Sequence, residues 1–293
     1  MKAAVVLMAY GSPERLSDVP AYYADIRGGR PVAPEQLADL VERYRRLGIE
    51  DSSPLNAITE QTRAALEAEL GLPVFTGMKH WTPRIADAAE AALASGADHI
   101  VGLVLAPHYS ALSIAGYREQ LERALAGGAE LLFVESWHDE PGFVELLADR
   151  VCGADAHVVF TAHSLPARIL EQGDPYKDQL LETSRLVAEA AGLRDWSFSF
   201  QSESPTGEPW LGPDILDHLE ALRRQGVERV LVCPVGFVSD HLEIRWDLDV
   251  EAQEKAAELG LELERIEMPN ADPSFVRTLA GIVKRALSVP STA

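Results

Sequence analysis

The segment "VVFTAHSLPA" at residues 158–167 is an apolar run that ends on a single histidine, His163, shortly before a proline. A similar segment, "VVLMAYGSPE" at residues 5–14, ends on Tyr10 in the matching place. The resemblance predicts that one unit of strands and helices occurs twice in the chain. A second pair of segments, an apolar run followed by polar or turn-forming residues, supports this repeat at 101–110 and 230–240.

Short apolar runs rich in Val, Leu and Ile alternate along the chain with stretches in which apolar residues recur every three or four positions. This alternation is typical of parallel sheets covered by helices on both faces. The apolar runs occupy residues 3–10, 72–77, 99–106, 130–136, 156–162, 196–201, 229–236 and 261–268. Helical spacing closed by a glycine occupies residues 34–48, 82–96 and 213–226. The sequence predicts an α/β fold of two Rossmann-like lobes, each a parallel sheet flanked by helices, with a ligand cleft between them at the strand ends.

The length of the chain also favours two lobes. Its 293 residues exceed the roughly 250 at which a single hydrophobic core usually stops growing. No long linker or low-complexity segment marks a boundary, so we place it near residue 150. The predicted lobes are therefore 1–150 and 151–293, and the C-terminal helix of the second lobe is expected to pack back on the first.

The chain is strongly acidic, with 46 Asp and Glu against 26 Lys and Arg and a net charge of −20. Nucleic acids and anionic membrane surfaces need basic patches, so we exclude both as partners. One local group of basic residues is either a solvated face or a site for an anionic ligand. It consists of Arg27, Arg30, Arg43, Arg45 and Arg46, set against Glu35, Asp39 and Glu42.

Only two cysteines, Cys152 and Cys233, are present, too few for a disulfide framework or a four-thiolate cluster. This usage suits a reducing cytoplasm. No apolar run approaches the roughly 18 residues that a membrane span needs, and the N-terminal run lacks the length of a signal-peptide core. We therefore expect a soluble cytoplasmic protein, and its acidic composition favours a monomer.

Candidate functional residues stand at the ends of the predicted strands. They include Tyr10, His108, His163 and the segment 236–251. Ligands bind at such strand ends in open α/β sheets. A lone histidine at a strand end is commonly a structural residue. The prediction of a functional site therefore depends on several polar residues standing at corresponding ends of different strands.

Three carboxylates, Glu243, Asp247 and Glu251, are spaced four residues apart, which places them on one face of a helix. The row is either a solvated acidic face or a path for divalent cations or protons. His163 and Glu243 together could bind a ferrous-like ion or accept protons. Motifs of P-loops, dinucleotide sites, zinc peptidases and serine hydrolases are absent from the sequence.

The combined motifs resemble those of the ferrochelatase family, and most closely its short bacterial type that acts on coproporphyrin III. They include "MAYGSP", "YYADIRGGR", "LAPHYS", "TAHSLP", "GDPY", "QSE", "PVGFVSDHLE", "WDLD" and "EMPNADP", spread over nearly the whole chain. The resemblance implies two Rossmann-type lobes with a porphyrin between them. It implies an enzyme of haem synthesis that inserts Fe(2+) into coproporphyrin III to give Fe-coproporphyrin III and two protons.

The resemblance also assigns residues. His163 and Glu243 match the catalytic metal-site pair of the family, and Tyr10 matches a tyrosine on the opposite face that can ligate product iron. Asp247 and Glu251 match an acidic row leading away from the metal, and His80 matches a more solvent-facing metal position. Positions that contact the porphyrin and its propionates are matched by Tyr10, Arg27, Arg43, Tyr44, Ser53 and Tyr117.

Two departures from some relatives refine these expectations. The chain has no C-terminal extension with cysteines, so we expect no iron–sulfur cluster and no cofactor beyond the substrate Fe(2+). The segment 20–36 is too polar to form the apolar lip of membrane-bound relatives, which favours a substrate with more carboxylates. The expected partners are a porphyrin, ferrous iron and, transiently, other enzymes of haem synthesis.

Three alternatives stay open at this point. The substrate could be protoporphyrin IX, or the enzyme could insert cobalt or nickel into a sirohydrochlorin-type ring, although such chelatases typically carry a second histidine where this chain has Glu243. The third alternative is a haem-binding carrier without catalysis, which would leave the acidic row unexplained. Removal of pyrrole protons requires a base, and His163 is the candidate because imidazole titrates near neutral pH.

Overall fold

The computed structural model describes residues 2–49, 54–204 and 206–288, and it contains two four-stranded parallel sheets with the same strand order. The first sheet has the order β2-β1-β3-β4 and the second β6-β5-β7-β8. Strands of the first sheet are β1 (Ala3–Ala9), β2 (Val74–Met78), β3 (His99–Val104) and β4 (Glu130–Val134). Those of the second are β5 (His157–His163), β6 (Trp196–Gln201), β7 (Arg229–Cys233) and β8 (Glu262–Arg265). The repeat is confirmed, because β1 and β5 hold equivalent places.

Helices connect the strands, as the apolar spacing predicted. The α-helices are α1 (Val19–Ile26), α2 (Pro34–Arg46), α3 (Pro54–Leu70), α4 (Ile85–Ala94), α5 (Ile114–Leu125), α6 (Pro141–Val151), α7 (Tyr176–Ala191), α8 (Ile215–Arg224), α9 (Gln253–Leu259) and α10 (Pro273–Ser288). Short 3-10 helices cover Leu16–Asp18 and Ala167–Ile169, and a π-helix, η3, covers Ile244–Ala252. No helix in the described ranges is both long and apolar enough to cross a membrane.

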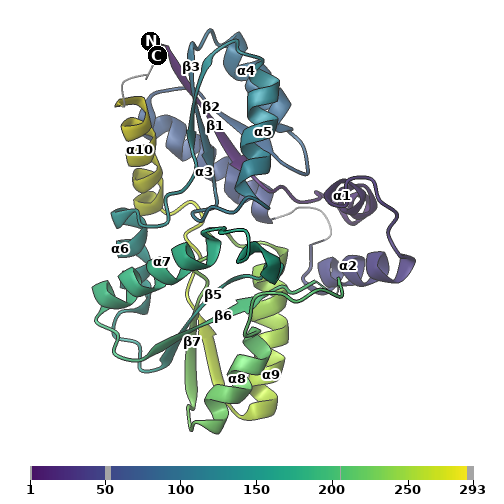
Figure 1. Ribbon diagram of the computed structural model, residues 1–293, viewed down its shortest axis with the longest axis vertical. Helices are drawn as coiled ribbons and strands as arrows, with labels where there is room; N and C mark the ends of the chain where they lie inside the picture. Colours follow the sequence, from purple (N-terminus) through teal and green to yellow (C-terminus); the bar gives the residue numbers. More distant parts are fainter. Residues whose placement is uncertain (1, 50–53, 205, 289–293) are drawn as a thin grey trace.

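Each sheet is covered on both faces. Helices α4 and α5 pack on one face of the first sheet, while α3, α6 and α10 pack on the other (Figure 1). In the second sheet α8, α9 and η3 cover one face, and the other shares a hydrophobic core with α6, α7 and α10. Phe143, Phe160 and Phe275 are all fully buried in this shared core. The last helix therefore returns to the lobe that begins the chain.

Two glycines allow the chain to turn tightly where the strands end. At Gly11 the backbone has φ +88°, and an added Cβ would lie 2.9 Å from the Cβ of Trp81. At Gly236 an added Cβ would lie 2.5 Å from the Cβ of Ala162, which is closer than any side chain tolerates. The Gly236 amide donates to the Thr161 carbonyl at 3.1 Å. The segment after β7 is thereby held against the end of β5.

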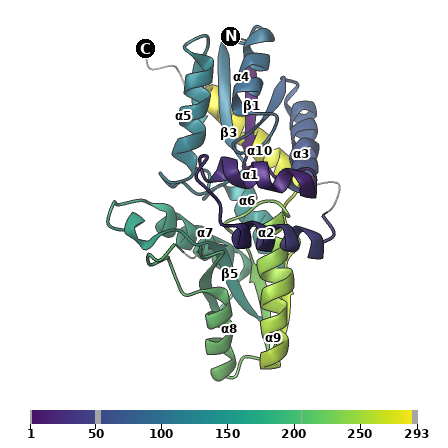
Figure 2. The same ribbon diagram turned by 90° about the vertical axis from the view of Figure 1, so that its right-hand side faces the viewer.

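Helices α1 and α2 lie beside the region between the two lobes (Figure 2). Both belong to the first half of the chain, yet α2 contacts the second lobe. The guanidinium groups of Arg43 and Arg46 lie over the ring of Trp246 in η3. Their Cζ atoms are 5.1 Å and 4.8 Å, respectively, from the ring centroid. Arg46 also pairs with Glu254 at 3.0 Å. These contacts fix α2 across the lobe boundary.

Candidate functional site

An imidazole and a carboxylate meet at the end of β5. His163 is the last residue of that strand, and its Nε2 lies 3.5 Å from Oε1 of Glu243, the residue preceding η3. The side chains are 29% and 41% exposed, so a ligand can reach both. The close approach at Gly236 explains how residues 80 positions apart in sequence come together.

A second imidazole lies on the other side of the same carboxylate. His241 Nε2 is 3.5 Å from Oε2 of Glu243, and its Nδ1 lies 2.9 Å from the Ser239 carbonyl, to which it can donate. Glu243 is therefore held between His163 and His241. His241 was not among the predicted site residues, although it stands only two residues before Glu243.

The charge state of the pair follows from its surroundings. Burial lowers the pKa of His163, but the Glu243 carboxylate, the Ser164 carbonyl and Asp247 together outweigh burial and raise the pKa to about 9. The pKa of Glu243 moves the other way: burial raises it, and the two imidazoles lower it well below its ordinary value. At neutral pH the site therefore holds a His163 imidazolium beside a Glu243 carboxylate. The imidazole expected to accept protons already carries one.

Tyr10 approaches this pair from the first lobe. It follows β1, is 42% exposed, and packs its ring against His80 with 4.6 Å between ring centroids. Burial and the negative charges of Glu243 and Asp25 raise the pKa of Tyr10 well above its ordinary value, so the phenol is neutral. We call Tyr10, His163, His241 and Glu243 the interlobe cluster.

His80 is anchored beneath Tyr10. Its Nδ1 lies 2.9 Å from Asp25 of α1, and Arg84 donates to the same carboxylate at 3.0 Å. Burial lowers the pKa of His80 despite the Asp25 carboxylate, with Lys79 and Arg84 adding to the effect. His80 therefore stays neutral at physiological pH, the form in which an imidazole can ligate a metal.

In the row of carboxylates, Asp247 and Glu251 lie on a π-helix and Glu243 directly precedes it, whereas the four-residue spacing implied one regular helix. Asp247 is only 7% exposed, and it accepts hydrogen bonds from Ser202 and from Gln201 at 3.3 Å. Burial, followed by the charges of Glu243 and Glu251, raises the pKa of Asp247 to about 6. The repulsion expected within the row is thus relieved by hydrogen bonds and by partial protonation of its middle member.

The arginine group is largely neutralised within the chain. Arg43 pairs with Asp39 at 2.9 Å, Arg45 pairs with Glu42, and Arg46 pairs with Glu254. Arg27 differs, because its Nε is buried and has no hydrogen-bond partner among the described residues. Of the predicted propionate-binding arginines, Arg27 therefore has a donor to spare, while Arg43 already serves a carboxylate and Trp246.

The predicted tyrosine contacts are enclosed by protein. Tyr44 is 2% exposed, with its hydroxyl 3.2 Å from Ser12 Oγ. Tyr117 is 4% exposed and lies beneath Lys79, whose Nζ is 4.8 Å from the ring centroid. Neither offers much surface to a ligand in this structure. Ser53 lies outside the described residues.

His108, at the end of β3, is a structural residue here. It is 3% exposed, and its Nε2 lies 2.9 Å from Thr183 Oγ1. Burial, with the nearby His138, lowers the pKa of His108 to about 3, so the imidazole is neutral. His108 was predicted among the strand-end candidates, but it is not part of the interlobe cluster.

Two further residues near the cluster, Tyr176 and Lys79, were not predicted as site residues. Tyr176 donates from its hydroxyl to the backbone carbonyl of His163 at 3.0 Å, which fixes the end of β5. Lys79, next to His80, donates to the Ser113 carbonyl at 3.0 Å, and burial lowers its pKa. Tyr176 lies in the "GDPY" motif, which was noted without a role.

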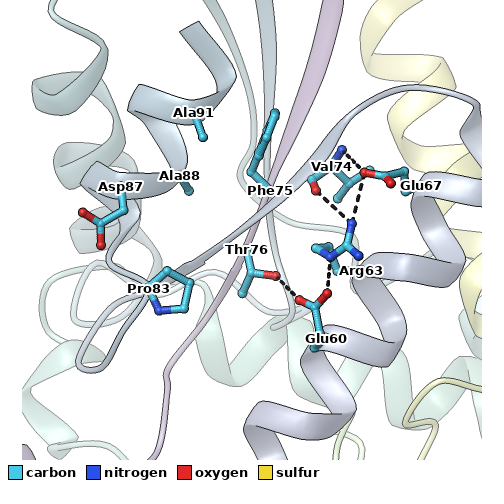
Figure 3. A pocket seen from close by; sticks show the side chains of 10 residues that line it. All are labelled: Glu60, Arg63, Glu67, Val74, Phe75, Thr76, Pro83, Asp87, Ala88 and Ala91. Atoms are coloured by element: carbon cyan, nitrogen blue, oxygen red, sulfur yellow. Dashed lines mark hydrogen bonds and ion pairs between the residues drawn. The ribbon is translucent and has the colours of Figure 1, made fainter. Parts of the chain in front are cut away.

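A hollow of about 350 Å³ lies elsewhere, between α3 and α4 beside the edge strand β2 (Figure 3). Side chains of α3 line its wall and form hydrogen bonds with backbone groups of the edge strand. Glu67 accepts from the Val74 amide at 3.0 Å, and Arg63 donates to the Val74 carbonyl at 3.2 Å. Glu60 accepts from Thr76 at 3.3 Å. The hollow is distinct from the interlobe cluster and protects a sheet edge from pairing with another strand.

Of the predicted metal ligands, the structure brings His163 and Glu243 together and sets Asp247 behind them. In the described ranges, no three His, Cys, Asp or Glu side chains converge in a geometry suited to a metal ion. The cluster thus offers two imidazoles and one carboxylate from the second lobe and a phenol from the first.

Comparison with known proteins shows what the chain resembles. The ferrochelatase family model matches residues 2–287. The ferrochelatase of Herpetosiphon aurantiacus is 46% identical over 301 residues, which cover 96% of this chain and 98% of that protein. The coproporphyrin III ferrochelatase of Halalkalibacterium halodurans is 40% identical over 305 residues, which cover 98% of each.

Among solved structures, SirB from Bacillus subtilis with Fe3+ has a TM-score of 0.62 at 13% identity, covering 98% of this chain and 96% of that one. At this level of identity the likeness concerns the fold alone. It agrees with the two-lobed α/β architecture described above.

Proposed function

The chain belongs to the ferrochelatase family, and we propose that it inserts Fe(2+) into coproporphyrin III, in haem synthesis, to give Fe-coproporphyrin III and two protons. Metal insertion into a porphyrin follows from the family. The choice of coproporphyrin III is supported by the relatives of that name at 40% identity and by the polar segment 20–36. The observation that carries the site assignment is the His163–Glu243 pair facing Tyr10 across the lobe boundary.

Insertion requires the two pyrrole N–H protons to leave as Fe(2+) binds the four ring nitrogens. In our proposal the porphyrin lies between Tyr10 on one side and His163 with Glu243 on the other. Fe(2+) binding at His163 would displace the imidazole proton, because a metal ligand must be deprotonated. The imidazolium is a main cause of the lowered pKa of Glu243, so Glu243 becomes able to take up a pyrrole proton only once His163 has lost its own.

The buried carboxylate row gives the released protons a place to go. Asp247, with its pKa of about 6, is partly protonated near neutral pH and can both take up and release a proton. It lies behind Glu243 and is influenced by the charge of Glu251. We therefore assign Asp247 and Glu251 to proton or cation transfer away from Glu243. Hydrogen bonds from Ser202 and Gln201 keep Asp247 fixed during that transfer.

Substrate anchoring is assigned to cations of the first lobe. Arg27 has a buried Nε without a partner among the described residues, and a planar guanidinium suits a propionate carboxylate. Contacts to such remote carboxylates can supply the roughly 1–5 kcal/mol needed to hold the ring in a bent shape. Coproporphyrin III carries four propionates where protoporphyrin IX carries two, so a polar rim in which Arg27 keeps a donor without a partner among the described residues favours the former.

We propose no resident cofactor and no iron–sulfur cluster. The only two cysteines are Cys152, which is exposed after α6, and Cys233, which is buried in β7. Too few thiols exist for a cluster. Free thiols of this kind suit the cytoplasm, where the protein is proposed to work and to exchange its porphyrins transiently with enzymes that act before and after it.

An anaerobic insertion assay with Fe(2+) tests the substrate assignment. Coproporphyrin III and protoporphyrin IX are compared by kcat/KM, and an Arg27→Gln variant serves as the probe of propionate binding. We expect a preference for coproporphyrin III that shrinks in the variant through a higher KM. A preference for protoporphyrin IX would overturn the assignment of coproporphyrin III as substrate. If the enzyme used only a sirohydrochlorin with Co(2+), the assignment of iron as the inserted metal would be wrong as well.

A further inference from the structure

Two histidines and a serine converge at the end of the second sheet that is opposite to the interlobe cluster. His157 is the first residue of β5, whereas His163 is its last, so about 20 Å of strand separates them. Ser197 is the second residue of the neighbouring strand β6, and His218 lies on α8, which covers this face. None of the three takes part in the proposed iron insertion.

The Nε2 atoms of both imidazoles face the same oxygen, Ser197 Oγ. His157 Nε2 lies 2.8 Å from Ser197 Oγ, and His218 Nε2 lies 2.7 Å from that same oxygen. Two atoms bonded to one oxygen at these lengths are at most about 5.5 Å apart. The other nitrogen of His157, Nδ1, lies 3.5 Å from Asp195 Oδ2. A histidine whose second nitrogen faces a carboxylate is the arrangement found around metal-binding histidines, because the carboxylate fixes the ring and its tautomer.

We propose that His157 and His218 bind one first-row transition-metal ion of the Zn2+ type through their Nε2 atoms, at a site separate from the interlobe cluster. Zn–N bonds are about 2.0–2.1 Å long, so two ligating nitrogens lie no more than about 4.2 Å apart. The two nitrogens, now at most about 5.5 Å apart, come within this limit if the rings close by about 1.3 Å or less, which replaces the hydrogen bonds through Ser197.

The surroundings permit that closure. His218 is half-buried on a surface helix, and His157, with 10% of its side chain exposed, is the fixed partner on the sheet. Asp195 is 88% exposed and lies 3.5 Å from His157 Nδ1, so it is a neighbour of that ring rather than a ligand of the ion. Two imidazoles supply two of the four ligands of a tetrahedral ion, and water supplies the rest, so the site is an open one.

The bound ion would link β5 to α8 and hold that corner of the second lobe together. Because the ion binds the folded chain, it raises the melting temperature by an amount that grows with the logarithm of the ion concentration above Kd. Its place in the fold distinguishes it from substrate iron, which acts at the other end of the strand. The proposal does not depend on which porphyrin the enzyme uses.

The test uses the full chain without a histidine tag, in a His163→Ala/Glu243→Gln background that removes the interlobe pair. Zn2+ is titrated by calorimetry, and Co2+ is followed by its visible absorption. We expect one ion per chain, with the affinity reduced at least tenfold by either His157→Gln or His218→Gln. His99→Gln is the matched control, since His99 is a half-buried histidine at the start of β3 with carboxylate neighbours. It should leave the affinity unchanged.

Folding of each variant is checked by circular dichroism and by its melting temperature. Zn2+ should raise the melting temperature of the background protein but not that of the His218→Gln variant. Equal Zn2+ affinity in the background and in His218→Gln, or no binding in the background, would overturn the proposal. Iron insertion in otherwise wild-type His218→Gln should stay at the wild-type rate, which separates this site from the proposed activity.

Discussion

Replacing Glu243 by glutamine should convert His163 from a cation to a neutral imidazole at pH 7. The atoms Nε2 and Oε1 are 3.5 Å apart, and at an effective dielectric constant of 20 two unit charges at that distance interact by about 5 kcal/mol, or about 3.5 pKa units. The wild-type pKa is about 9. Without the carboxylate, burial prevails, and we expect the pKa of His163 to fall below its ordinary 6.5. The protonated fraction at pH 7 then drops from about 99% to less than about a quarter.

The measurement is an NMR titration of protein with 15N-labelled histidines between pH 5 and 9.5. The chain has eight histidines, and the His163 signals are identified by their absence in His163→Asn. Glu251→Gln is the control, because it removes a carboxylate of the same row that does not touch His163. His163 titrating near 6.5 in the wild type, or staying near 9 in Glu243→Gln, would refute the electrostatic account of the site.

The same pair makes stability depend on pH in a defined window. His163 has a raised pKa in the folded state, so its contribution is complete below about 6.5 and is lost as the pH rises through 9. Glu243 has a lowered pKa, so its contribution is present above about 4.5 and is lost in acid. The unfolding free energy of the wild type relative to Glu243→Gln should be larger near pH 6 than at pH 10, by at least about 1 kcal/mol after allowance for solvent screening of the exposed side chains. This gain should be lost as the pH rises through 9.

Three further outcomes are expected. His163→Ala should abolish iron insertion while the porphyrin still binds, as measured by absorbance titration; wild-type turnover would remove His163 from the mechanism. The double variant Asp247→Asn/Glu251→Gln should raise the apparent KM for Fe(2+) severalfold with little change in porphyrin KM, and an unchanged KM would reduce the row to a polar face. Tyr176→Phe removes the hydrogen bond from the Tyr176 hydroxyl to the His163 carbonyl, so it should lower the free energy of unfolding by about 0.5–1.5 kcal/mol. It should also lower kcat by a larger factor than it changes KM. If only the stability falls, Tyr176 has a structural role alone.

Much of the fold was predictable because strands and helices carry periodic patterns. All eight apolar runs are strands, and the similarity of residues 5–14 to 158–167 corresponds to equivalent central strands in two sheets. Local sequence contains that information, since burial on both faces needs continuous apolar residues. The π-helix at 244–252 was not predictable, because a shift in hydrogen bonding from i+4 to i+5 has no residue signature in this segment.

The residues of the site were predictable from the sequence, but their protonation states were not. The sequence suggested His163 and Glu243 as a pair, and the structure places them 3.5 Å apart. It could not reveal that His163 is protonated at rest, since a pKa depends on burial and on neighbours distant in sequence. Nor could it show that Arg43 and Arg46 lie over Trp246, a contact between residues about 200 positions apart.

The return of α10 to the first lobe bears on how the chain folds during synthesis. Chains emerge from the ribosome at roughly 5–20 residues per second, and N-terminal domains usually fold first. Here the apolar faces of α3 and α6 receive Phe275 and Leu279 only after residue 273 has been made. The first half of the chain therefore waits several seconds or more with an uncovered face. A ribosome-bound fragment ending at residue 150 should bind chaperones, and the two halves, although built alike, cannot mature one after the other.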